Sequence, residues 1–346
     1  PSFLQDVVPC ENYTDHGGGC SPEYSNSLLQ STLLDFISDF GETYDGDKRI
    51  AFIQIGLLGF WGEWHTYPHT EWFADDAFQQ AVITAFDQAF DVTPIQLRLP
   101  YQDSPQRNIG FHDDSFAYST IGDIPWFFWS KMTDAQATTR WESEPMGGEI
   151  YPPLQQFLFT EEYVEDTYQQ NFSEAVQTTH MTYLLNYQAF CMNGMGYVGS
   201  QFETAQQEAL AMGYEFTIEK TIVNLTDIRD DRVNLQLEVH IRNSGNAPFY
   251  YPLTLSIRKK GDGEELVAFS DVETLLPSEE SSVYSTEIFD LPISDVLNGY
   301  DIQLRSNHIL ENAHISWAND GQSEGMMDIN YVTTCISEDV SYVIGQ

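Results

Sequence analysis

Positively charged side chains are scarce in this 346-residue chain. It contains 14 Lys and Arg residues against 53 Asp and Glu residues, a formal net charge of −39 at pH 7. Such a surface repels the phosphates of nucleic acids and of anionic membranes, so the sequence predicts neither as a partner. The acidic residues are spread along the whole chain, so the acidity belongs to the entire protein surface.

Several familiar patterns are also missing. The chain has no apolar run of eighteen residues, so we expect no membrane insertion. It has no glycine-rich phosphate loop, no dinucleotide fingerprint and no G-x-S-x-G elbow, which argues against nucleotide binding and serine hydrolysis. It also has no H-E-x-x-H motif and no C-x-x-C pair, so no tight metal signature is present.

Four cysteines occur in the chain. Cys10 and Cys20 flank a glycine-rich loop that a disulfide could close, and Cys191 and Cys335 could then tie the end of one domain to the C-terminal tail. The alternative is four buried free thiols. We favour disulfides, which are typical of secreted proteins.

Three N-x-S/T triplets, at Asn12, Asn171 and Asn224, predict an extracellular glycoprotein. The chain starts at Pro1, with neither an initiator Met nor a signal peptide. We therefore expect a processed chain, or a segment that precedes this one.

The first two thirds of the sequence alternate between two hydrophobic periods. Helical spacing occurs at 25–42, 75–90, 171–180 and 202–213, and strand-like runs at 49–59, 93–100, 108–118, 147–152 and 181–187. This alternation predicts parallel βαβ units, and a spacing of roughly 35–45 residues per unit favours a barrel with long loops. Five strands cannot close an eight-stranded barrel, so either the early strands precede Pro1 or the sheet is open.

After about residue 213 the pattern changes to short segments that alternate apolar and polar residues between turn signals. This is typical of an immunoglobulin- or fibronectin-like β-sandwich of about seven strands. We predict a barrel portion over 1–213, a sandwich over 214–335 and a tail over 336–346.

The stretch "GLLGFWGEWHTYPHTEWF" places Glu63 between Trp61 and Trp64, with His65 just after it. If 49–59 is a barrel strand, this acid lies at the carboxyl end, where parallel barrels carry their active sites. Tryptophan faces bind sugar rings, and tryptophan walls would exclude water from Glu63, as a general acid requires. The alternative is that both tryptophans are core anchors and that Glu63 caps a backbone group.

Glycosidic chemistry usually needs a second carboxylate. Glu149 in "PMGGEIYP" is the best candidate, although it could instead be an exposed strand residue. Asp113 and Asp114, beside His112, are a third candidate. They could be catalytic, bind calcium or form a turn.

Three further side chains could enter the same site. Arg98 could hold a carboxylate, either of a substrate or of Glu63, or could form a structural ion pair. Tyr183 and Asn186 could reach the site from the strand predicted at 181–187.

A metal site is a competing interpretation. Glu63, His65, His112 and Asp113 are all plausible ligand types. The turns "YDGDK", "HDDS" and "KGDGEE" could bind calcium, but they are equally good turns without it. We predict no required cofactor and keep calcium as an alternative.

The motifs "GDKRIAFIQIGLLGFWGEWHTYP", "GGGCSPEYSNSLL", "GGEIYP" and "RNSGNAPFYYPLTLSI" resemble those of a poorly characterised family of glycoside-hydrolase-like barrel proteins. The resemblance covers roughly residues 1–330 and implies strands 4–8 of a (β/α)8-type barrel followed by a β-sandwich of unknown function. It further implies that Glu63 is the acid/base, after strand four, and that Glu149 is the nucleophile, after strand seven. Gly62 stands where the wider group of retaining glycosidases usually has Asn.

These observations together predict a secreted carbohydrate-active protein that hydrolyses glycosidic bonds by a retaining two-carboxylate mechanism. The alternative is a non-catalytic extracellular glycoprotein that binds glycans or builds a surface assembly. The expected partners are carbohydrates, with self-association or a preceding segment or chain that completes the barrel as further possibilities.

Overall fold

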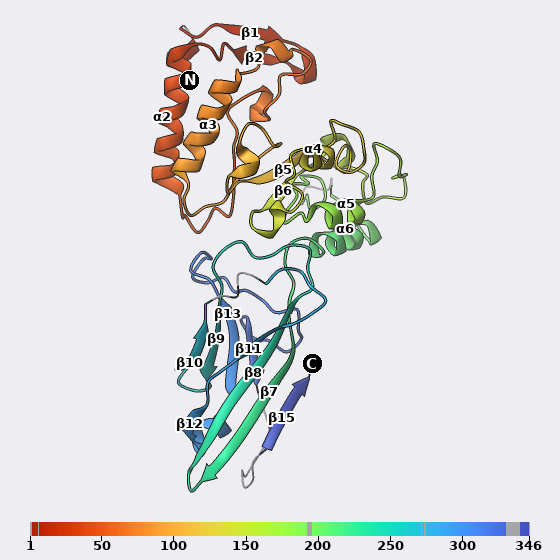
Figure 1. The fold of residues 1–346 in the computed structure, drawn as a ribbon. Coiled ribbons are helices and arrows are strands. Elements are labelled where there is room, and N and C mark those ends of the chain that lie inside the picture. The colour runs from red at the N-terminus through yellow and green to blue at the C-terminus, as the bar shows by residue number, and fades with distance from the viewer. Residues whose placement is uncertain are drawn as a thin grey trace. The chain divides into compact units, whose positions relative to one another are not determined.

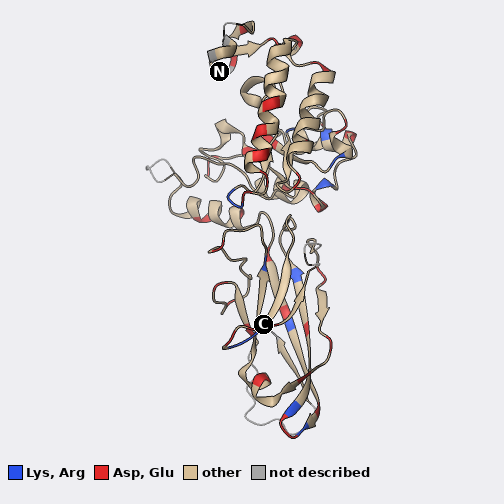
Figure 2. Ribbon diagram, turned by 90° about the vertical axis from the view of Figure 1, so that its left-hand side faces the viewer, with Lys and Arg blue, Asp and Glu red and all other residues tan. Residues whose placement is uncertain are grey.

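The computed structural model describes residues 2–5, 7–191, 196–270, 272, 275–329 and 340–345. The chain divides into two compact units, Pro1–Ala211 and Met212–Gln346 (Figure 1). No helix among the described residues is long and apolar enough to cross a membrane. Acidic residues occur in both units, as expected from the net charge (Figure 2).

A four-stranded parallel sheet forms the centre of the first unit. Its strands, in spatial order, are β3 (Ile53–Gln54), β4 (Ile95–Leu97), β5 (Gly110–Phe116) and β6 (Met146–Ile150). Beyond β6, a single parallel bridge joins Glu149 to Leu185. The apolar residues of these strands, such as Ile95, Leu97 and Phe111, are buried.

The prediction of a (β/α)8-type barrel is wrong. The parallel sheet is half of such a barrel, and the other sheets among the described residues are antiparallel. Two of the five expected strands contribute little: 49–59 yields only two strand residues, and 181–187 yields only the bridge at Leu185. The backbone at Leu57 and Gly59 has positive φ, so the chain leaves the sheet soon after Gln54.

The helices of the first unit are α1 (Ser2–Gln5), α2 (Ser27–Tyr44), α3 (Asp76–Ala89), α4 (Phe128–Asp134), α5 (Phe172–Thr179) and α6 (Ser200–Leu210). Four of them, α2, α3, α5 and α6, correspond to the predicted helical segments, whereas α1 and α4 were not predicted. Asn26, Asp75 and Asn171 cap the first turns of three of the predicted helices by accepting hydrogen bonds from backbone N–H groups. Helices α2 and α3 lie side by side (Figure 1).

A hairpin near the start of the chain carries the predicted disulfide. Strands β1 (Cys10–Tyr13) and β2 (Gly19–Pro22) pair antiparallel, and Cys10 is bonded to Cys20, which confirms that prediction. The other expected pair includes Cys335, which lies outside the described residues.

The second unit contains two antiparallel sheets around one hydrophobic core. Alternate residues of its long strand β8 (Arg232–Asn243) are buried, so the period of two seen in the sequence sets which side chains face the core. One sheet has the order β10 (Glu265–Phe269), β9 (Thr254–Lys259), β13 (Tyr300–Arg305) and β14 (Met326–Ile329). The other has the order β11 (Ser282–Ser285), β8, β7 (Phe216–Arg229) and β15 (Val340–Gly345), with β12 (Phe289–Pro292) also paired to β8 and helix α7 (Ile293–Asn298) following it.

Candidate active site

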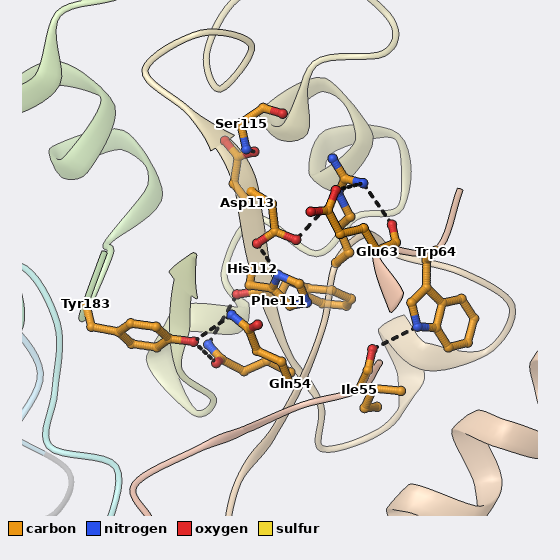
Figure 3. A network of polar contacts seen from close by, with 12 residues as sticks. Gln54, Ile55, Glu63, Trp64, Phe111, His112, Asp113, Ser115 and Tyr183 are labelled. Carbon is orange, nitrogen blue, oxygen red and sulfur yellow. Dashed lines mark hydrogen bonds and ion pairs between the residues drawn. The ribbon is translucent and has the colours of Figure 1, made fainter. Parts of the chain in front are cut away.

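One face of the parallel sheet carries polar side chains. Gln54 and Gln96 are register partners on β3 and β4, and both contact the Tyr183 hydroxyl (Figure 3). Tyr183 donates to Gln96 Oε1 at 2.6 Å and accepts from Gln54 Nε2 at 3.1 Å. Burial raises the pKa of Tyr183 to about 12, so it is a neutral donor at pH 7. A Cβ at Gly147 would lie 2.2 Å from the Tyr183 ring, so glycine is needed there.

The loop after β3 presents Glu63 to this face. Gly59 has φ of 81°, and a Cβ there would lie 2.5 Å from the backbone nitrogen of His65, so only glycine fits this tight turn. The Glu63 carboxylate lies 3.2 Å from Arg98 Nη1 and 3.4 Å from His65 Nε2. Arg98 also donates to the backbone oxygen of Glu63 at 2.8 Å (Figure 3). Arg98 therefore fixes both the loop and its carboxylate, one of the roles predicted for it.

The two tryptophans beside Glu63 have different environments. Trp64 is 1% exposed, donates from Nε1 to the Ile55 oxygen at 2.8 Å and stacks on Tyr101. Its ring belongs to the core and is not available to a ligand, which corrects its predicted place in the substrate site. Trp61 is 56% exposed and lies edge-on to His65. Only one of the two predicted tryptophan faces is therefore open to solvent.

Asp114 extends the cluster along β5. His112 Nδ1 lies 2.8 Å from Asp114 Oδ1, and Arg98 Nε lies 3.8 Å from Asp114 Oδ2. Burial alone would raise the pKa of Asp114, but His112 and Arg98 together lower it. Sequence reasoning gave Asp114 no role separate from Asp113. The strand period of two distinguishes them, because Asp114 lies on the same face of β5 as His112, whereas Asp113 lies on the opposite face.

Asp113, by contrast, holds the loop that follows β5. It accepts hydrogen bonds from Thr120 Oγ1 at 2.7 Å and from the backbone N–H of Ser115 at 2.9 Å. Burial raises the pKa of Asp113 to about 6, against an ordinary value of 3.8. Its hydrogen bonds give it a positioning role in this loop.

Glu149 on β6 is the third carboxyl group near this face. It accepts from Gln155 Nε2 at 2.9 Å. Burial raises the pKa of Glu149, and the negative charges of Asp114 and Glu63 raise it further. The charges of Asp114 and Glu63 therefore favour the protonated form of Glu149, which lies on the strand next to β5.

Asn186 and the residues considered as metal ligands are arranged differently from the interpretation of the sequence. The Asn186 side-chain oxygen accepts from the backbone N–H groups of Gln188 and Ala189, so this residue shapes the chain after Leu185. Within the described ranges, no three His, Cys, Asp or Glu side chains are grouped as metal ligands. The four residues considered as possible metal ligands, Glu63, His65, His112 and Asp113, therefore do not form one group.

The arrangement is a set of three carboxyl groups with an arginine and two histidines, beside one exposed tryptophan. It can supply an anionic nucleophile, a proton donor and hydrogen bonds to hydroxyl groups. Comparisons with protein-family models, with curated proteins and with solved structures find nothing that matches this chain.

Proposed function

We propose that this protein hydrolyses glycosidic bonds at the carboxyl edge of the parallel sheet. The observation that carries the proposal is that Arg98 lies 3.2 Å from the Glu63 carboxylate and 3.8 Å from that of Asp114, while Glu149 lies on the neighbouring strand β6. Glycoside hydrolysis requires two carboxyl groups with different protonation states facing one bond. Neighbouring carboxyl groups in different surroundings have different pKa values, so one can be protonated while the other is ionised.

The surroundings favour the reverse of the roles that the sequence resemblance implies. Burial raises the pKa of Glu149, which suits it to protonate the leaving oxygen. Glu63 is ion-paired with Arg98 and is the better nucleophile for the anomeric carbon. Water then cleaves the glycosyl ester on Glu63, with Glu149 now acting as the base.

Substrates that differ in leaving group test these roles. We expect Glu149→Gln to lose activity on natural glycans but to retain hydrolysis of dinitrophenyl glycosides, whose leaving group needs no proton. Glu63→Ala should lose both activities, and azide should restore turnover by forming a glycosyl azide of inverted configuration. Glu142→Gln, at the exposed end of the 3-10 helix Arg140–Glu142, is the matched control. Full activity of Glu63→Ala on every substrate would refute the mechanism.

The cellular setting belongs to the same proposal. The Cys10–Cys20 disulfide is compatible with an extracellular protein, and we propose that the chain is secreted and that carbohydrate is its main partner. Among the strands that the structure describes, β3 is the terminal strand of its sheet, so we also propose that a strand from a preceding segment or a second chain pairs there. A non-catalytic glycan-binding role is the outcome if glycans bind and are not cleaved.

A further inference from the structure

Four aromatic side chains outside the carboxyl cluster stack on one another, and we call this group the aromatic platform: Tyr118, Trp126, Tyr151 and Tyr168. Tyr118 stacks on Tyr151 with ring centroids 4.2 Å apart and on Tyr168 at 5.0 Å. Trp126 lies within 19° of parallel to Tyr168 at 6.3 Å. Trp126 is 50% exposed, and Tyr168 is also exposed. Two of the four rings are therefore open to solvent, and clustered exposed aromatic rings of this kind are typical of binding sites.

The platform begins at the same sheet edge as the proposed active site. Tyr118 follows the end of β5 by two residues, and Tyr151 follows β6 directly, two residues after Glu149. The backbone N–H of Tyr151 donates to the Phe116 oxygen at 3.0 Å, which keeps the ends of the two strands together. A chain-like ligand bound between the carboxyl groups can therefore continue onto these rings.

Buried neighbours hold the platform in place. Phe127 is buried and packs edge-on against Trp126 at 4.8 Å and against Tyr168 at 6.0 Å. Asp166 Oδ1 accepts from the backbone N–H of Tyr168 at 2.6 Å. Rings fixed in this way lose little conformational entropy when a ligand binds.

A hollow of about 510 Å³ adjoins Phe127. Its walls include the carboxylates Asp123, Glu165 and Asp166 and the amide of Gln169, and no Lys or Arg lines it. Carboxylates and amides accept hydrogen bonds from hydroxyl groups. The lack of a cation in this lining, together with the net charge of −39, disfavours an anionic ligand.

We propose that the aromatic platform is a subsite for the pyranose rings of a neutral oligosaccharide, so that the substrate is a neutral polysaccharide. In this proposal, the apolar C–H face of the sugar packs on an aromatic ring face. Its equatorial hydroxyls donate hydrogen bonds to the carboxylates of the hollow beside Phe127. This inference rests on the proposed function, because it places the extended part of the same substrate.

The test compares substrates of different length. Trp126→Ala and Tyr168→Ala should raise KM for neutral oligosaccharides of increasing length by about threefold to tenfold more than for an aryl monosaccharide glycoside. Trp126→Phe should recover part of the loss. Phe36→Ala, which removes a ring of similar exposure (48%) on α2, is the matched control and should leave KM unchanged for every substrate.

A binding assay separates this inference from the proposed function. The assay measures how strongly wild type, Trp126→Ala and Phe36→Ala are retarded in gels that contain neutral or anionic polysaccharide. In the neutral gel, Trp126→Ala should be retarded less than wild type, and Phe36→Ala should be retarded as much as wild type. In the anionic gel, the three proteins should migrate alike. If the wild type binds neutral polysaccharide through Trp126 but cleaves no glycan, the subsite stands and the proposed hydrolysis fails. If glycans are cleaved and the KM of Trp126→Ala shows no dependence on length, the subsite is overturned and the hydrolysis stands. Stronger retardation by anionic polysaccharide would also overturn the inference.

Discussion

Arg98 should be the most important single cation for the stability of the first unit. Its guanidinium is 17% exposed and lies 3.2 Å from the Glu63 carboxylate and 3.8 Å from that of Asp114. Arg98→Met keeps most of the side-chain volume but removes the charge. It leaves two carboxylates close together and takes away the hydrogen bond to the Glu63 backbone oxygen.

The magnitude follows from these distances. At an effective dielectric constant of about 20, an ion pair at such a separation is worth about 4–5 kcal/mol before desolvation is counted. Desolvation offsets much of that attraction, whereas removal of one partner leaves the other buried and unpaired. Because Glu63 is 31% exposed, we expect Arg98→Met to lower the free energy of unfolding by about 2–3 kcal/mol.

Urea denaturation at pH 7 and at pH 3 measures this effect. The pKa of Asp114 is lowered in the folded state, so its stabilisation is present above its unfolded pKa and is lost as the pH falls through the folded pKa. The difference between wild type and Arg98→Met should therefore shrink at pH 3. Arg49→Met removes a cation that is 72% exposed and should have no measurable effect. Equal stability of Arg98→Met and wild type at pH 7 would refute the reasoning.

Three other variants test separate features of the structure. Trp64→Ala should lower the free energy of unfolding by about 3–5 kcal/mol, because the ring is buried, whereas Trp61→Ala should change it by less than about 0.5 kcal/mol; urea titrations compare the two. Burial raises the pKa of Asp113 to about 6, so this carboxyl group costs stability as the pH rises from about 4 through 6. Asp113→Asn should therefore gain up to about 3 kcal/mol relative to wild type between pH 4 and pH 7, and parallel pH profiles of the two proteins would contradict this. Peptide mapping after expression in a glycosylating host should find glycan on Asn12, which is exposed, and little on Asn171, whose side chain caps α5; full occupancy of Asn171 would contradict the cap.

The sequence predicted local structure well where one period extended over several residues. The apolar stripe at 75–90 corresponds to α3, and the run at 108–118 contains β5. In both cases, neighbouring residues supply the burial pattern. The prediction of a strand over 49–59 was wrong because an apolar stretch can leave a sheet as readily as continue it. The backbone turns away from the sheet at Leu57 and Gly59, both of which have positive φ.

The site was predicted only in part. Glu63 and Glu149 were selected from the sequence because each follows glycines near a strand end, and in the structure burial and, to a smaller extent, the charge of Glu63 raise the pKa of Glu149. The distinction between Asp113 and Asp114 was missed, although they are adjacent, because it depends on which strand face each occupies.

The sequence by itself determined the strand and helix periods, the acidic surface and the identity of the aromatic and carboxylate residues around Glu63. These depend on composition and on neighbours within a few residues. Only the tertiary structure decided that the parallel sheet has four strands, that Trp64 is a core residue while Trp61 is exposed, and that Arg98 joins Glu63 to Asp114. The reason is that sheet closure, side-chain burial and ion pairing depend on residues distant in the sequence, whose approach no local pattern encodes.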